Sequence, residues 1–160
     1  VVDQKMILSN AGRGVQTLWN GLSGRFPSIE LDASVVMPNH VHGILVLVGA
    51  GLALPLEGAA SSAPTGSAST TLGRVLRAFK SISAVGVNRL LSRSGQPLWQ
   101  RGYYEHVIRS EESLNRIREY IATNPLRWEL DRENPGRKGE DEFDHWLATF
   151  KSRPQKAEKE

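Results

Sequence analysis

The chain has 160 residues, 39% of them hydrophobic and 23% charged, which suits one soluble globular domain with its own core. It contains no cysteine, and this excludes disulfides, cysteine nucleophiles and thiolate metal sites. A bound metal would use histidine, carboxylate, amide or water ligands, which favours Mg²⁺, Mn²⁺ or histidine-bound zinc. Lysine and arginine number 20 against 17 acidic residues, a basic balance that is compatible with nucleic acid without requiring it. No apolar run has the length of a membrane span, so no membrane partner is expected.

The N-terminal part predicts a helix followed by an antiparallel pair of strands. Ser9 or Asn10 can cap a helix whose apolar residues recur at helical spacing. Residues 29–37 alternate in polarity as a strand, and residues 40–48 predict the next strand. The residues expected on one face of the first strand are Leu31, Ala33, Val35 and Met37. Pro38-Asn39 supplies turn chemistry between the two strands, which indicates a hairpin.

The middle of the chain predicts a loop and a long helix. Residues 49–69 are rich in Gly, Ala, Ser and Pro, which is typical of a flexible loop. Thr70 or Thr71 can cap a helix that continues to about Leu91. The basic residues away from its apolar stripe are Arg74, Arg77 and Lys80. Such a face is either simply solvated or follows phosphate groups.

The C-terminal part predicts a strand and two helices. Residues 103–109 alternate as a strand, and Ser110 is a good cap for the helix that follows. This helix should end at Asn124-Pro125, because the residue before a proline is pushed out of α geometry. Residues 143–150 carry apolar side chains at the spacing of a short amphipathic helix.

The order of these elements favours an α+β fold, in which helices pack on an antiparallel sheet. We expect a single domain over residues 1–150. Residues 151–160 are polar and predict a disordered tail.

Two histidines mark the start of the second strand. Because side chains two apart share a face of a strand, His40 and His42 should point the same way while Val41 points into the core. Two such imidazoles can bind a divalent metal if a third ligand comes from elsewhere in the fold. The alternative is a pair of surface histidines near a turn.

Tyr120 and Asn124 are the candidates for the other half of the site. They are four residues apart at the end of one predicted helix and therefore share a face. A phenol is a weak nucleophile until a cation or base stabilises its phenolate, which a metal held by the histidines could do. The alternative for Tyr120 is an aromatic residue at the edge of an apolar helix stripe.

These segments together resemble a known family. The run Val36-Met37-Pro38-Asn39-His40-Val41-His42-Gly43 resembles the HUH motif, histidine–bulky apolar residue–histidine, of single-tyrosine transposases. Trp99 to His106 and Tyr120-Ile121-Ala122-Thr123-Asn124-Pro125 resemble the C-terminal half of the same family. The REP-associated tyrosine transposases of bacteria are the most similar branch, and the similarity extends from about Met6 to Trp128.

The resemblance implies a ferredoxin-like, HUH-type sheet and a role for each matched residue. His40 and His42 would bind Mg²⁺ or Mn²⁺, with Asn124 as the third ligand. Tyr120 would attack a phosphate of single-stranded DNA, which leaves a 5′-phosphotyrosine link and a free 3′-hydroxyl that can reverse the reaction. The residues expected to contact phosphates are Arg74, Arg77, Lys80 and Arg101. Tyr103 and Tyr104 are rival nucleophiles that rank below Tyr120, because tyrosine is a common structural residue in strands.

The family also implies a setting. Its members recognise imperfect hairpins in repetitive extragenic palindromes in the bacterial cytoplasm, so the expected partner is hairpin DNA and the expected protein is a monomer or homodimer. They usually carry an N-terminal strand ahead of the segment that begins at Val1, and we expect the sheet here to lack it. A truncated or domesticated protein that binds hairpin DNA without cleaving it is therefore the alternative function. A small metal-binding protein without a role on DNA is a third hypothesis.

Overall fold

The computed structural model describes residues 7–48 and 72–151. The expected flexible loop at 49–69 and all but the first residue of the expected tail lie outside the described residues. The elements in chain order are α1 (Asn10–Asn20), α2 (Leu22–Arg25), β1 (Ile29–Val36), β2 (Val41–Leu47), α3 (Leu72–Leu90), α4 (Glu111–Thr123), the 3₁₀ helix η1 (Asn124–Leu130) and α5 (Glu142–Lys151). The predicted α+β class is confirmed.

β1 and β2 form the predicted antiparallel hairpin. Val36 lies opposite Val41, and Val35 lies opposite His42. The backbone N–H of Met37 donates to the carbonyl oxygen of His40 at 2.9 Å, which closes the turn. The hairpin thus holds both histidines at one end of the sheet.

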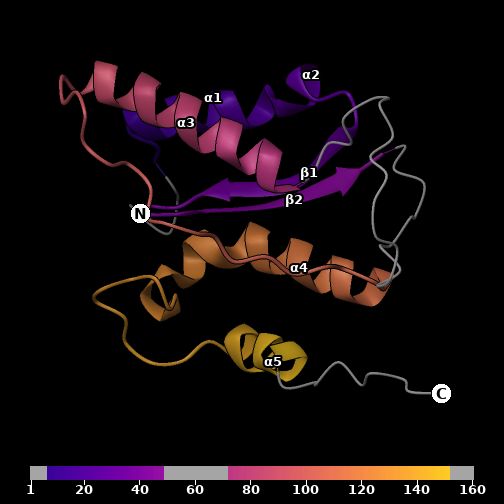
Figure 1. The fold of residues 1–160 in the computed structure, drawn as a ribbon. Coiled ribbons are helices and arrows are strands. Elements are labelled where there is room, and N and C mark those ends of the chain that lie inside the picture. The colour runs from indigo at the N-terminus through magenta and orange to yellow at the C-terminus, as the bar shows by residue number, and fades with distance from the viewer. Residues whose placement is uncertain (1–6, 49–71, 152–160) are drawn as a thin grey trace.

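The helices cover the two faces of this hairpin differently. Figure 1 shows α1, α2 and α3 on one face, α4 on the other, and α5 beyond α4. On β2, Val41 and Leu45 pack into the core with α1 and α3, whereas Ile44 packs with α4 and α5. Alternation along the strand therefore places His42 on the α4 side together with Ile44.

One expectation about β1 is wrong. Leu31 packs into the core with α1 and α3, whereas Ala33 and Val35 pack toward α4. The register shifts between Leu31 and Ser34, because three residue steps on β1 oppose two on β2. An extra residue of this kind moves all later side chains to the other face, and the sequence pattern does not reveal it.

The predicted strand at 103–109 is also wrong. These residues lie within the described part of the chain and form neither a helix nor a strand. Tyr103 is 47% exposed, Tyr104 46% and Val107 68%, so no sheet face buries their alternating side chains. The alternation predicts strand geometry, but these residues pair with neither β1 nor β2, and alternation alone does not ensure pairing.

The helix that carries Tyr120 ends close to where proline predicts. α4 begins after the predicted cap Ser110, whose hydroxyl accepts the backbone N–H of Ser113, and it ends at Thr123. The 3₁₀ helix η1 follows directly, with Pro125 in its first turn. Proline is tolerated there because the first backbone N–H groups of a helix have no partner within it.

Asp32 on β1 and Arg118 on α4 join the sheet to that helix. The guanidinium of Arg118 donates to both carboxylate oxygens of Asp32, at 3.0 Å from Nε to Oδ1 and 2.5 Å from Nη2 to Oδ2. The hydrogen bonds from Arg118 hold the pKa of Asp32 below its ordinary value.

Among the helices that the structure describes, none combines the length and the hydropathy of a membrane-spanning segment.

Gly43 makes room for the largest residue of the core. Trp19 is 5% exposed and meets Phe79 edge to face at a centroid distance of 5.2 Å. A Cβ atom on Gly43 would lie 2.1 Å from Cζ2 of Trp19, which no packed structure tolerates. β2 therefore needs glycine directly after its histidine.

We expect Gly43→Ala to destabilise the fold by about 1–3 kcal/mol, because the rigid indole must move to admit the methyl group. Urea unfolding followed by tryptophan fluorescence measures this change. Gly14→Ala on α1 is the matched control, since a Cβ there meets nothing within 4 Å, and it should raise stability by up to about 1 kcal/mol. Equal unfolding midpoints for wild type and Gly43→Ala would contradict the packing argument.

We expect Asp32→Asn to lower stability at neutral pH by removing the charged bond to Arg118. The depressed pKa of Asp32 means that its contribution is present above the unfolded-state pKa of about 3.9 and is lost as pH falls through the folded-state value. The gap in urea midpoint between wild type and Asp32→Asn should therefore be full at pH 7 and shrink below about pH 4. A gap that does not change with pH would contradict this account.

Candidate functional site

The structure brings His40 and His42 together as predicted. Their Nε2 atoms lie 2.8 Å apart, and their ring centroids are 4.5 Å apart at an interplanar angle of 81°. His40 belongs to the turn and His42 to β2, so the hairpin itself places the two nitrogens. Two ring nitrogens this close can share one proton or one metal ion.

Asp131, directly after η1, completes a group that can bind a metal ion. One ligand atom from each of His40, His42 and Asp131 lies within 4.8 Å of the others. Oδ2 of Asp131 is 3.5 Å from Nε2 of His40 and 3.9 Å from Nε2 of His42. Sequence reasoning missed Asp131. Its signal was weak: a lone aspartate in a polar stretch that no motif connects to the histidines.

A second set of hydrogen bonds orients these ligand atoms. Nδ1 of His40 contacts Oδ1 of Asn39 at 2.8 Å, and Nδ2 of Asn39 donates to the carbonyl oxygen of Glu133 at 2.6 Å. The backbone N–H of Glu133 donates in turn to Oδ1 of Asp131 at 2.7 Å. With its proton on Nδ1, His40 turns the lone pair of Nε2 toward His42 and Asp131. Hydrogen bonds of this kind, to the ligand's other nitrogen or oxygen atom, are typical of metal sites.

The residues present fit a divalent cation. Oδ2 of Asp131 is buried and has no hydrogen-bond partner among the described residues. A buried carboxylate oxygen left this way costs free energy unless another group meets it. A cation coordinated by Oδ2 and the two Nε2 atoms would remove that cost.

The charge states in the folded protein also suit metal binding. Burial is the main reason why the pKa of His42 is lowered, so its imidazole is neutral at pH 7. Burial alone would raise the pKa of Asp131, but the neighbouring imidazoles of His40 and His42 and the hydrogen bond from the Glu133 amide outweigh it and hold that pKa well below its ordinary value. Neutral imidazole and ionised carboxylate are the forms that ligate metals.

Tyr120 lies beside this group. Its ring is 5.2 Å from that of His42 by centroid, at 73°, and its other neighbour is Phe143 of α5, stacked at 3.7 Å and 12°. The side chain is buried, with 7% exposed. Burial raises the pKa of Tyr120 well above its ordinary value, and the negative charge of Asp131 raises it further. The phenol is therefore held neutral.

Asn124, the predicted third ligand, is also buried. It is 1% exposed, and its Oδ1 has no hydrogen-bond partner within the described part of the chain. Its backbone N–H donates to the carbonyl oxygen of Tyr120 and continues the helical bonding across the end of α4. A metal-binding role for Asn124 stays a prediction, and Asp131 is a further candidate for the oxygen ligand.

The residues predicted to contact phosphates do not gather around Tyr120. α3 carries three of them and packs on the opposite face of the sheet from α4 (Figure 1). Arg74, Arg77 and Arg101 are exposed. Nζ of Lys80 donates to the carbonyl oxygens of Gln100 at 2.6 Å and Gly102 at 2.8 Å, so this side chain holds a loop. DNA contacts by these residues stay a prediction.

The rival tyrosines lie away from the stacked pair. Tyr104 is exposed, with the guanidinium of Arg132 5.2 Å above its ring, and Tyr103 is exposed as well. Tyr120, by contrast, makes an edge-to-face contact with the ring of His42. Tyr120 is therefore the stronger candidate of the three.

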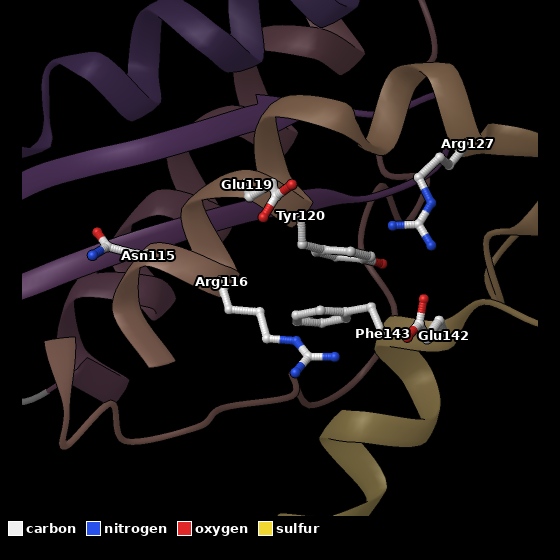
Figure 2. Close-up of a pocket in the computed structure, with 7 residues that line it drawn as sticks. All are labelled: Asn115, Arg116, Glu119, Tyr120, Arg127, Glu142 and Phe143. Atoms are coloured by element: carbon white, nitrogen blue, oxygen red, sulfur yellow. The ribbon is translucent and has the colours of Figure 1, made fainter. Parts of the chain in front are cut away.

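A cavity of about 440 Å³ reaches Tyr120 from outside. Figure 2 shows it between α4 and the first turn of α5, with the Tyr120–Phe143 stack in its wall. Its lining residues are Asn115, Arg116, Glu119, Tyr120, Arg127, Glu142 and Phe143. Sequence reasoning missed the two arginines, which look like ordinary polar residues of a solvated helix face.

We expect Asp131→Asn to weaken binding of Mn²⁺ about tenfold or more, because it removes the anionic member of the group. Titration with Mn²⁺, followed by electron paramagnetic resonance of the free ion, measures the affinity. Asp144→Asn on α5 removes the same charge outside the group and should change the affinity less than about twofold. Asn124→Ala, measured in parallel, tests the ligand that the sequence predicted. Wild-type affinity in Asp131→Asn would contradict the assignment of Asp131.

Comparison with known proteins adds a relative. No family model matches the chain, and no solved structure matches it. A protein of Haemophilus influenzae described as "Uncharacterized protein" is 37% identical over 137 residues, which cover 82% of this chain and 74% of the relative. At that identity and coverage, the chain belongs to the same family as this Haemophilus protein.

Proposed function

We propose that this protein is a metal-dependent transposase of the HUH, single-tyrosine type. It would cut and rejoin single-stranded hairpin DNA of repetitive palindromic elements, with Tyr120 as nucleophile and Mg²⁺ or Mn²⁺ as cofactor. The observation that carries the proposal is the contact between Tyr120 and His42. Two motifs far apart in the sequence meet with ring centroids 5.2 Å apart.

The reaction follows from the groups at the site. Oη of Tyr120 attacks the phosphorus of a phosphodiester, a Tyr–O–P bond forms, and the bond from phosphorus to the 3′-oxygen breaks. The phenol gives up its proton, the 3′-oxygen gains one, and the products are a 5′-phosphotyrosine and a free 3′-hydroxyl. The same steps in reverse join the strand to a new 3′-hydroxyl, so no ATP is needed. A bound divalent cation would polarise the phosphodiester and offset the charge of the transition state.

His40, His42 and Asp131 are the residues that would hold that cation, with Asn124 as a further candidate. The high pKa of Tyr120 matters here, because burial and nearby carboxylates keep the phenol protonated in the free protein. Positive charge beside the ring is what lowers such a pKa. The nucleophile would therefore form only when the site is loaded.

A second function has its own supporting observation. Tyr120 is 7% exposed and lies under the ring of Phe143, which restricts the approach of a phosphodiester. A protein that binds hairpin DNA without cutting it, as a domesticated or truncated relative would, is compatible with such a covered tyrosine. The two functions differ in one product, the covalent link.

We expect a labelled hairpin oligonucleotide and Mn²⁺ to give a covalent protein–DNA band on a denaturing gel. The band should disappear in Tyr120→Phe and in the presence of chelator, because both the hydroxyl and the cation are needed. Tyr104→Phe is the matched control and should keep the band. A band that persists in Tyr120→Phe would overturn the choice of nucleophile. Hairpin binding without any band in the wild type would favour the second function.

A further inference from the structure

The cavity beside Tyr120 has the size and lining of a ligand site. Its volume of about 440 Å³ falls in the range of sites for small ligands. Figure 2 shows the side chains of Arg116 and Arg127 on either side of the Tyr120–Phe143 stack. Tyr120 is one of the lining residues, so an occupant of the cavity would lie near the proposed nucleophile.

One side of the cavity is lined by the flat side chains of Phe143 and Arg116, and both contact the ring of Trp146. Phe143 is stacked on Tyr120, and the centroid of Trp146 lies 5.0 Å from that of Phe143. The guanidinium of Arg116 lies 4.7 Å above the Trp146 ring. Aromatic rings and guanidinium planes are the surfaces on which unpaired nucleobases stack.

The other side offers a fixed cation. Nη2 of Arg127 donates to Oδ1 of Asp141 at 2.5 Å, and Asp141 is 2% exposed. The same carboxylate oxygen accepts the backbone N–H of Phe143 at 2.7 Å, so Asp141 holds Arg127 and the start of α5 together. Arg127 has five N–H donors, and those not facing Asp141 suit a phosphate oxygen.

Two carboxylates complete the lining of the cavity. Glu119 and Glu142 line the cavity, and an ionised carboxylate only accepts hydrogen bonds. Adenine, cytosine and guanine carry an exocyclic amino group that can donate to it, as carboxylates do with the amino group of cytosine in DNA grooves. Thymine has no amino group.

We propose that this cavity binds one unpaired nucleotide next to the phosphate that Tyr120 attacks, and that it prefers a base with an exocyclic amino group over thymine. The base stacks against Arg116 and Phe143, the carboxylates of Glu119 and Glu142 accept its amino group, and Arg127 meets its phosphate. This subsite rests on the proposed function, for which it names a substrate feature.

The test is binding of short single strands by the full chain in chelator, where no cleavage takes place. Fluorescence anisotropy would compare labelled hexamers of deoxycytidine and of thymidine. We expect the deoxycytidine strand to bind at least about fivefold more tightly. Arg116→Leu should weaken its binding about tenfold, the scale of one lost base-stacking contact. The double variant Glu119→Gln, Glu142→Gln should bind both strands alike, because an amide also donates to thymine.

Arg89→Leu is the matched control. Arg89 is an exposed arginine on α3, so the variant removes the same charge from the other face of the sheet and should change affinity less than about twofold. Thermal unfolding of each variant identifies any that does not fold, and the double variant tests the base preference independently of Arg116. Equal binding of the two strands by the wild type, or equal losses in Arg116→Leu and Arg89→Leu, would overturn the subsite.

The result is separable from the covalent-adduct assay. Adduct formation together with indifference to the base and to Arg116 would overturn the subsite and leave the tyrosine chemistry standing. Base-selective binding that depends on Arg116, without any adduct, would support the subsite and overturn cleavage.

Discussion

The structure depends on the contacts that β2 makes on both of its faces. Gly43 lies against Trp19 on one side, and Ile44 packs with α4 and α5 on the other. These contacts on opposite faces oppose a slip of β2 by one residue, since a slip would exchange every side chain between the faces. Core packing of the residues next to His42 thereby determines the face of the sheet on which His42 lies.

The site is assembled where three separate segments end. His40 belongs to the hairpin turn, Tyr120 to the last turn of α4, and Asp131 follows η1 directly. Residues at segment ends and in the loops that follow them often supply binding groups, because a rigid scaffold positions them. The bridge from Asn39 to Glu133 then ties the hairpin turn to the Asp131 loop at 2.6 Å.

The same packing creates a conflict at Tyr120. Stacking on Phe143 places the ring accurately beside His42, and a nucleophile held in one orientation loses less entropy when it reacts. Burial also keeps the phenol neutral, and the cavity lined by Arg116 and Arg127 reaches Tyr120 from solvent. A substrate strand that enters through this cavity would pass the surfaces that we assign to base and phosphate binding.

The sequence by itself determined the local elements and the face shared by the two histidines. Period-2 alternation, Pro38-Asn39 and the Ser110 cap are local signals, and local geometry decides their outcome. It failed at residues 103–109, because alternation describes a strand but not the partner that it must pair with. It also failed at the bulge in β1, because one extra residue leaves no mark on composition.

Only the tertiary structure decided which carboxylate lies beside His40 and His42, and which arginine side chains lie on the same face of the sheet as Tyr120. Asp131 is far from the histidines in sequence, and many acidic residues of the chain look the same until folding buries one of them beside the imidazoles. The basic residues of α3 were the predicted phosphate contacts, yet α3 packs on the opposite face of the sheet from Tyr120. The arginines beside Tyr120 are Arg116 and Arg127. Distance through space depends on the packing of the whole chain, and spacing along the sequence does not contain it.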